Sequence, residues 1–325
     1  MDKKVLVSGI GGNVGQGIIR NINKVFPNVI IVGVDINDFS SGNHLCDIFY
    51  KVPYANDSRY IESINEIVKK EQVNLIIPST DYEVFYLSKY QHLIKCTIAV
   101  SEFKTADFCT DKMKTYEHFR DHNMSFAPST LPSKYVSNQF DKLIVKPIEG
   151  RGSRDIYINP KNISAFSDKF LVQKLYEGIE VTIAFYVNKV NILHGFITQE
   201  RTLESGTTKN TKVTKAYDAL VEPLLNKLIK SANFSGSINL QAIITKENTI
   251  HPFEVNCRIS GTNSMRSNFG FEDIKYTLQE YLFNDKLSKV RIREGIATRI
   301  IMDVIYTEAK DYNEATNKKS THFIF

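Results

Sequence analysis

Several features that would place a chain in a particular class are missing from this sequence. No apolar stretch approaches the roughly 18 residues of a transmembrane helix, and the apolar run near the start soon reaches glycine, so we expect neither a membrane span nor a signal peptide. The four cysteines are scattered without a C-x-x-C pair, which favours reduced thiols in the cytoplasm over a disulfide framework or a zinc site. Internal repeats and low-complexity segments are also missing.

A strong charge of one sign is missing as well. The 325 residues include 41 lysines and arginines against 36 aspartates and glutamates, which gives a formal net charge of +5. So small an excess of positive charge argues against a histone-like nucleic-acid binder or a polybasic membrane binder, but it is compatible with the binding of a small anionic ligand. With 42% hydrophobic residues the chain is expected to fold, and its length predicts two or three domains of roughly 100–200 residues each.

The first hundred residues alternate between strand and helix patterns. Buried strands are predicted for four short apolar runs, residues 4–8, 29–34, 73–77 and 96–100. Two stretches carry apolar residues at helical spacing, residues 16–25 and 59–72. Strand, glycine turn, helix and strand at this spacing make a βαβ unit. Residues 1–108 are therefore expected to form a Rossmann-like, doubly wound parallel sheet.

A glycine-rich turn follows the first predicted strand. Gly9, Gly12 and Gly15 fit a G-x-x-G-x-x-G spacing, and Asp35 follows at the distance where a carboxylate holds a ribose in dinucleotide sites. An NAD-dependent nucleotide-sugar dehydrogenase or epimerase is therefore one alternative, although no convincing Tyr-x-x-x-Lys pair accompanies the turn. The other interpretation is that the glycines only allow the strand to turn tightly into the helix.

Asp81 follows the end of another predicted strand, where α/β sheets present functional groups. The more ordinary interpretation is that Asp81 caps the next helix. The alternative is that it lines a substrate cleft.

A basic, glycine-containing loop follows the predicted strand at residues 143–145. Lys146 stands at the end of this strand, and the segment Glu149-Gly150-Arg151-Gly152-Ser153 comes shortly after it. The backbone N–H groups of such a loop approach phosphate oxygens closely, and lysine and arginine supply positive charge. The P-loop sequence is not found in the chain, so the segment is either a different kind of phosphate site or a hairpin turn.

Polar side chains alternate along two segments near the end of the chain. Residues 237–244 and 250–262 are expected to pair, and residues two apart in a strand share a face. Glu254, Asn256 and Arg258 then point the same way, with Gln241 beside them. A carboxylate, two amide oxygens and an arginine suit Mg²⁺ next to a phosphate. An exposed polar strand face is the alternative.

Taken together, these segments resemble the ATP-grasp enzymes, most closely their carbamoyl-phosphate-synthetase-like branch, which includes carboxylate–amine ligases. Five motifs occur in the order and spacing of that family: Asp111-Lys112, Lys146-Pro147, residues 149–153, residues 173–180, and Gln241 with Glu254, Asn256 and Arg258. The resemblance implies that an α+β ATP-grasp fold follows the first domain. Its small lid lobe would cover residues 109–175, and its C-terminal lobe with the metal site would cover residues 176–325.

The resemblance also implies roles for the residues that contact the nucleotide. Lys112 and Lys146 would neutralise the phosphates of ATP beneath a lid. That lid would comprise Gly150, Arg151, Gly152 and Ser153, and Glu149, just before it, would also belong to the nucleotide site. The side chain of Gln173 and the backbone of Leu175 would read the adenine.

Further roles are implied for the C-terminal lobe. Glu180 would hold the ribose hydroxyls, and Arg258 would stabilise the transferring phosphoryl group. Gln241, Glu254 and Asn256 would hold one or two Mg²⁺ ions, or Mn²⁺ in their place. Many relatives have a carboxylate at the position of Gln241, so its neutral amide lowers the negative charge of this metal site.

The activity implied by the resemblance is ATP-dependent ligation of a carboxylate to an amine through an acyl phosphate. The partners would be ATP, a small carboxylate and an amine, without nucleic acid or membrane, and the resemblance allows a homodimer. Arg201, on an expected loop, and Arg266, after the glycine turn at Gly261, are candidates to bind an acceptor carboxylate, or else surface arginines. Two more functions stay open: that of a catalytically inactive ATP-binding regulatory protein, and that of an enzyme that phosphorylates an acid without an amine acceptor.

Overall fold

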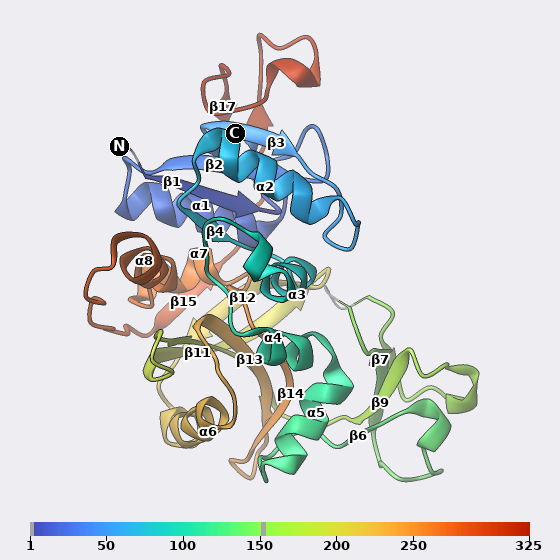
Figure 1. The fold of residues 1–325 in the computed structure, drawn as a ribbon. Helices are drawn as coiled ribbons and strands as arrows, with labels where there is room; N and C mark the ends of the chain where they lie inside the picture. The colour runs from blue at the N-terminus through green and yellow to red at the C-terminus, as the bar shows by residue number, and fades with distance from the viewer. Residues whose placement is uncertain (1–2, 151–153) are drawn as a thin grey trace.

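The computed structural model describes residues 3–150 and 154–325. Figure 1 shows an α/β domain formed by the first part of the chain, a small lobe set to one side, and a larger lobe on which the α/β domain sits. Three residues of the expected lid, Arg151, Gly152 and Ser153, lie outside the described residues.

The first domain is built on a five-stranded sheet in which every neighbouring pair runs parallel, in the order β3-β2-β1-β4-β5. Its strands are β1 (Lys4–Ser8), β2 (Ile30–Asp35), β3 (Ile48–Lys51), β4 (Leu75–Ile77) and β5 (Thr97–Ile98). Its helices are α1 (Asn13–Val25), α2 (Tyr60–Glu71) and α3 (Asp81–Lys89).

The helices of this domain cover both faces of the sheet because the side chains of β1 alternate. Val5 and Val7 belong to the core that includes Ile18 and Ile22 of α1. Leu6, which points the other way, belongs to the core shared with α2 and α3. The prediction of a doubly wound parallel sheet is confirmed.

The small lobe is a four-stranded antiparallel sheet with a core of its own. Its strands, in the order β6-β9-β7-β8, are β6 (Ser129–Thr130), β7 (Leu143–Pro147), β8 (Tyr157–Ile158) and β9 (Phe170–Lys174). Leu143, Val145 and Val172 are buried together there, apart from the other cores.

Helices α4 (Phe103–Thr110) and α5 (Lys112–Asp121) precede the small lobe and pack against strand β14 (Ile250–Asn256) of the larger lobe. Phe119 of α5 accordingly belongs to the core that extends into the larger lobe. The lid lobe expected from residue 109 therefore begins with a helix that packs with the larger lobe.

The larger lobe contains a six-stranded antiparallel sheet in the order β14-β13-β10-β11-β12-β15. Besides β14, its strands are β10 (Ile179–Val187), β11 (Leu193–Glu204), β12 (Thr207–Val213), β13 (Gly236–Ile244) and β15 (Gly295–Thr298). Its helices are α6 (Asp218–Ser231), α7 (Asn263–Arg266) and α8 (Asp273–Leu278). An antiparallel sheet with helices packed against it agrees with the expected α+β ATP-grasp fold.

The last segment of the chain returns to the first domain, although residues 176–325 were all expected in the larger lobe. The segment contains the two-stranded sheet of β16 (Val304–Ile305) and β17 (Phe323–Ile324). The backbone N–H of Lys318 donates to the carbonyl of Cys46 at 2.8 Å, and the rings of Phe39 and Tyr312 lie 4.7 Å apart between centroids. Figure 1 shows β17 next to the parallel sheet, far from β15.

Short helical turns complete the chain: η1 (Asn43–Leu45), η2 (Gln91–Leu93), η3 (Pro132–Lys134), η4 (Ile163–Ala165), η5 (Ser267–Phe269), η6 (Gln279–Phe283) and η7 (Tyr312–Glu314).

Helix α1 docks the first domain onto the larger lobe through close backbone approach. A Cβ atom at Gly17 would lie only 2.1 Å from Oδ1 of Asn263, and one at Gly261 would lie 2.8 Å from Nδ2 of Asn13. Asn263 is fully buried and donates from Nδ2 to the carbonyl of Val14 at 3.2 Å. The absence of a side chain at Gly17 is therefore needed for the contact between the domains, because Asn263 is buried and held in place, whereas Gly261 faces the end of the Asn13 side chain.

The glycine-rich turn itself is occupied by contacts within the protein. Gly9 has a φ of +57°, and a Cβ atom at Gly15 would lie 2.5 Å from the carbonyl oxygen of Gly9. The carboxylate of Asp35, which a dinucleotide site would offer to a ribose, accepts the backbone N–H of Gly11 at 2.8 Å. These contacts agree with the interpretation of the glycines as a tight turn.

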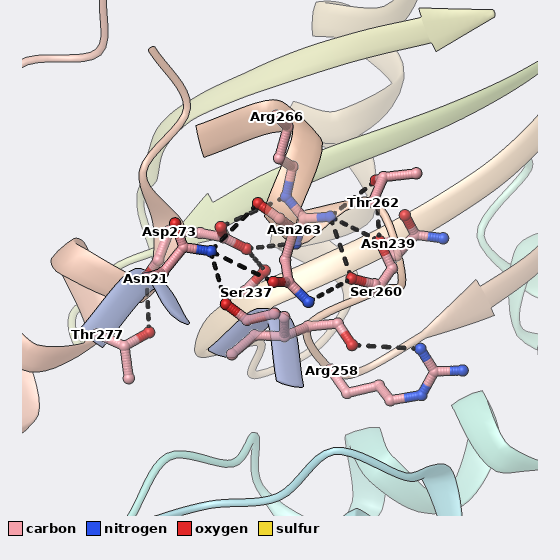
Figure 2. Close-up of polar contacts among 12 residues, drawn as sticks. Asn21, Ser237, Asn239, Arg258, Ser260, Thr262, Asn263, Arg266, Asp273 and Thr277 are labelled. Atoms are coloured by element: carbon pink, nitrogen blue, oxygen red, sulfur yellow. Dashed lines mark hydrogen bonds and ion pairs between the residues drawn. The ribbon is translucent and has the colours of Figure 1, made fainter. Parts of the chain in front are cut away.

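A buried polar network supports the larger lobe beneath this contact, as Figure 2 shows. Arg266 and Asp273 form an ion pair of 2.5 Å, and both side chains are fully buried. Arg266 also donates from Nη1 to Oγ of Ser260 at 2.7 Å and to Oγ1 of Thr262 at 2.9 Å, and Ser237 donates to Asp273 at 2.5 Å. The network fixes the turn that follows β14, because Ser260 and Thr262 belong to that turn.

We predict that Gly17→Ala destabilises the protein by about 1–3 kcal/mol, because the new methyl group meets the buried amide of Asn263. Helix propensity alone would give the opposite sign, since alanine is favoured over glycine inside a helix by roughly 0.5–1 kcal/mol. Urea unfolding measures the difference. Gly12→Ala is the matched control, because a Cβ atom there lies 3.4 Å from its nearest neighbour. Stabilisation by Gly17→Ala would contradict the close approach.

Asp273→Ala should destabilise the protein by about 3–5 kcal/mol, because it leaves the charge of Arg266 buried without its partner. Glu272→Ala is the neighbouring control. Glu272 forms a 3.2 Å pair with Lys275 that keeps about a third of each side chain exposed, so the change should be below about 1 kcal/mol. If urea unfolding gave similar losses in the free energy of unfolding for the two variants, the buried pair would contribute no more to stability than the exposed pair.

Candidate active site

A pocket opens where the first domain, the start of α5, the end of β7 and strand β14 come together. The described residues that line it are Asp81, Tyr82, Cys109, Thr110, Lys112, Glu149, Gly150, Glu254 and Asn256. They come from segments spread over most of the chain, so only the folded arrangement brings them to one place. Lys112, Glu149, Gly150, Glu254 and Asn256 are among the residues predicted for a nucleotide and metal site.

The β13–β14 hairpin brings the three candidate metal ligands together. Gln241 pairs with Glu254, and the register shifts at a bulge between Gln241 and Ala242. Asn256 donates from Nδ2 to Oε1 of Glu254 at 2.9 Å, and Nε2 of Gln241 lies 3.5 Å from Oδ1 of Asn256. Within the described part of the chain no group of three His, Cys, Asp or Glu side chains forms a metal cluster, so this site offers one carboxylate and amide oxygens.

Two buried lysines stand beside this hairpin. Lys112 is the first residue of α5, which Asp111 caps by accepting the backbone N–H groups of Met113 and Lys114 at 2.8 and 2.9 Å. The ammonium of Lys112 donates to the carbonyls of Ile148 and Gly150 at 3.4 and 3.3 Å.

Lys146, near the end of β7, donates to the carbonyl of Phe253 at 3.3 Å and lies 5.1 Å from the centroid of its ring. Lys112 is 8% exposed and Lys146 is 6% exposed. These buried cations have few acidic partners, as is typical of a site that receives an anion.

The charges in the pocket perturb one another. Burial lowers the pKa of Lys146 to about 8; the charge of Lys112 acts in the same direction, and Glu254 opposes it. Burial by itself raises the pKa of Glu254, but the cations Lys112, Lys146 and Arg258 and the hydrogen bond from Asn256 outweigh that effect, so the pKa lies below its usual value. Glu254 is therefore ionised at neutral pH and available as a ligand.

Arg258 is held by the first domain. Its Nη2 donates to Oδ2 of Asp81 at 2.8 Å and to Oδ1 of Asn256 at 3.3 Å. The expectation that Asp81 caps a helix is wrong: the cap of α3 is Thr80, which forms a reciprocal capping box with Glu83. The spacing Thr80-x-x-Glu83 is itself the capping-box signature, so the sequence held the signal that frees Asp81 for the pocket.

Arg201 lies within the second half of strand β11, whereas a loop was expected. Its Nη2 donates to Oε1 of Glu180 and to Oε1 of Gln241, at 2.5 Å in each case. The structure thus brings Arg201 into contact with the candidate ribose ligand and a candidate metal ligand.

Two residues expected to read the adenine make contacts inside the small lobe. Gln173 is 2% exposed and donates from Nε2 to Oγ of Ser129 at 2.9 Å. The backbone N–H of Leu175 donates to the carbonyl of Lys142 at 2.9 Å. The adenine-reading roles of Gln173 and Leu175 stay predictions, and each residue makes at least one hydrogen bond within the lobe.

Arg266 was a candidate to face the cleft and bind an acceptor carboxylate, and this expectation is wrong. Its side chain is fully buried, and its guanidinium is taken up by Asp273, Ser260 and Thr262. A single sequence does not distinguish an arginine that pairs with a buried aspartate seven residues later from one that faces a cleft.

The fold and the pocket define an ATP-grasp protein, and a family model described as ATP-grasp domain matches residues 109–262. A second family model, described as PylC-like, N-terminal domain, matches residues 5–99. The chain therefore contains an ATP-grasp domain, and its first domain is of the PylC-like N-terminal type. No significant match is found among curated proteins.

Solved structures share this architecture across most of the chain. N5-carboxyaminoimidazole synthetase from Staphylococcus aureus, solved with ADP, has a TM-score of 0.73 at 15% identity, covering 93% of this chain and 83% of that one. L-amino acid ligase from Bacillus licheniformis has a TM-score of 0.70 at 12% identity, covering 86% and 74%. The biotin carboxylase domain of 2-oxoglutarate carboxylase from Hydrogenobacter thermophilus, solved as a dimer, has a TM-score of 0.67 at 13% identity, covering 98% and 77%.

At these identities the likeness to solved structures establishes the fold. Of the helices in the described residues, none is long and apolar enough to cross a membrane.

The lowered pKa of Lys146 predicts a pH-dependent contribution to stability. Between about pH 8 and its ordinary pKa of 10.5, the unfolded chain holds the lysine proton and the folded chain has released it. The free energy of unfolding from this group therefore rises with pH across that window. Wild type should gain stability relative to Lys146→Met between pH 8 and pH 10, as urea unfolding would measure.

The matched control for this prediction is Lys104→Met, which removes an exposed lysine of α4. Its difference from wild type should stay constant over the same pH range. A constant difference for Lys146→Met as well would contradict the effect of burial on this lysine.

Proposed function

We propose that this protein is an ATP-dependent carboxylate–amine ligase. It would activate a small carboxylic acid as an acyl phosphate, join the acid to an amine, and release ADP and phosphate. The observation that carries the proposal is the convergence of Lys112, Lys146 and Arg258 around the carboxylate of Glu254. Asp81 pairs with Arg258, which leaves the two buried lysines with little acidic compensation, and this arrangement suits a polyanion such as ATP.

The proposed reaction has two steps. An oxygen of the substrate carboxylate attacks the γ-phosphorus of ATP, the bond from this phosphorus to the β,γ-bridging oxygen breaks, and ADP leaves. The amine nitrogen then attacks the acyl carbon, the bond from this carbon to the phosphate oxygen breaks, and the nitrogen loses a proton. Lys112 and Lys146 would hold the phosphates. Arg258, kept in place by Asp81, would stabilise the negative charge of the phosphoryl group as it passes from ATP to the substrate carboxylate.

Mg²⁺ fits the donors of the pocket. The carboxylate of Glu254 and the amide oxygen of Asn256 are hard oxygen ligands of the kind that Mg²⁺ and Mn²⁺ prefer. When bound, the ion would neutralise phosphate charge.

The partners in this proposal are ATP, a small carboxylate and an amine. We also propose that the enzyme acts in the cytoplasm, where thiols stay reduced, which agrees with four free cysteines. A homodimer is the proposed oligomeric state, supported by the dimeric biotin carboxylase domain with the same fold; sedimentation of the purified chain tests it.

A screen of carboxylic acids against amines, with Mg²⁺ and ATP, tests the proposal by phosphate release. With an acid labelled by ¹⁸O in its carboxylate, the label should appear in the released phosphate, because the acyl phosphate takes one carboxylate oxygen. Glu254→Gln and Lys146→Met should each lower turnover by at least about 100-fold. Glu62→Gln, which changes an exposed glutamate of α2, is the control and should keep full activity.

Each alternative has its own outcome in this screen. Undiminished turnover in Glu254→Gln would overturn the site. Labelled phosphate from an acid without any amine would indicate phosphorylation alone. ATP binding without phosphate release for any pair would indicate a regulatory protein, and nicotinamide binding without ATP turnover would indicate a dehydrogenase.

A further inference from the structure

The proposed reaction assigns no role to Arg201, although its guanidinium lies within the site. Nη2 contacts Gln241 and Glu180 as described, and Nε also donates to Oε1 of Glu180 at 2.8 Å. The side chain of Arg201 is 13% exposed and that of Glu180 is 31% exposed. A permanent positive charge therefore lies directly against the hairpin that carries Glu254.

The sheet fixes this placement. Thr182 of β10 pairs with Gln199 of β11 on one side and with Gln241 of β13 on the other. Arg201 is two residues from Gln199, and Glu180 is two residues from Thr182, so all of these side chains project from the same face of three neighbouring strands. The contact is a property of the strand register.

The amide of Gln241 is poorly suited to a divalent ion in this arrangement. Its oxygen already accepts from Arg201, and its nitrogen faces Asn256. An Mg²⁺ ion bound to that oxygen would lie about 2.1 Å from it. The guanidinium nitrogen is 2.5 Å from the same oxygen, so the ion and this nitrogen would lie within about 4.6 Å of each other, and two positive charges at such a separation repel in a partly buried site. Glu254 has no such neighbour bound to it: its described hydrogen-bond partner is the amide of Asn256. The oxygen of Asn256 does accept from Arg258, but at 3.3 Å, a much longer contact than the 2.5 Å between Arg201 and Gln241.

We propose, resting on the proposed function, that the nucleotide site of this protein holds a single divalent cation, on Glu254 and Asn256, and that Arg201 supplies as a fixed charge what a second ion would supply. Within the described chain Nη1 of Arg201 makes no hydrogen bond, so its two N–H groups are available to nucleotide oxygens. Arginine suits this role because it stays charged at every physiological pH and offers several donors in one plane.

The test counts Mn²⁺ ions per bound nucleotide by electron paramagnetic resonance, with the full chain and the non-hydrolysable β,γ-imido analogue of ATP. Wild type should bind one Mn²⁺ per bound nucleotide. Two ions per nucleotide would overturn the inference while leaving the proposed function intact. Absence of nucleotide binding would overturn the proposed function and this inference with it.

Variants separate the charge of Arg201 from its packing. Arg201→Lys keeps the charge and should keep the count at one. Arg201→Met combined with Gln241→Glu removes the cation and adds a carboxylate, and should raise the count to two. Arg59→Met, an exposed arginine, is the control and should leave the count unchanged. A count of two in Arg201→Lys would assign the effect to shape instead of charge and would overturn the inference, even if the double variant does not fold.

Discussion

The seating of helix α1 on the turn at residues 260–263 is the contact on which the remaining geometry depends. Gly17 and Gly261 allow the backbones to approach, and the buried pair of Arg266 and Asp273 holds the turn from below. Arg258 stands just before this turn and Asp81 belongs to the first domain, so the same seating decides whether the two charges meet. The glycine-rich end of the first domain thereby contributes to the assembly of a site that lies in another part of the chain.

The site places positive charge where few acidic groups balance it. Lys112 and Lys146 are buried against carbonyl groups, and the shared carboxylate nearby is that of Glu254. Removing such cations from water is unfavourable unless a partner compensates. A bound polyanion would provide this compensation, so the incompletely paired charges of the free protein would favour binding of the anion. Burial lowers the pKa of Lys146 for the same reason, because the free protein gives the charged form of this lysine little compensation.

Periodicity and motif spacing predicted most of the architecture. The parallel sheet, the β13–β14 hairpin and the grouping of Gln241, Glu254 and Asn256 follow from local patterns, because strand alternation decides which side chains share a face. The positions of the two candidate arginines did not follow. Arg201 meets Glu180 through strand register and Arg266 meets Asp273 inside the core, and both pairings depend on tertiary packing that a single sequence does not reveal.

The separate core of the small lobe has a consequence for how the molecule moves. The first domain and the larger lobe share their hydrophobic cores, whereas Leu143, Val145 and Val172 pack only within the small lobe. Thermal motion would then move the small lobe as a unit relative to a more rigid body that consists of the first domain and the larger lobe. Lobe opening of this kind occurs in microseconds to milliseconds. If release of ADP requires this opening of the small lobe, lobe opening would limit the rate of turnover instead of the chemical steps, and the rate would then depend on solvent viscosity.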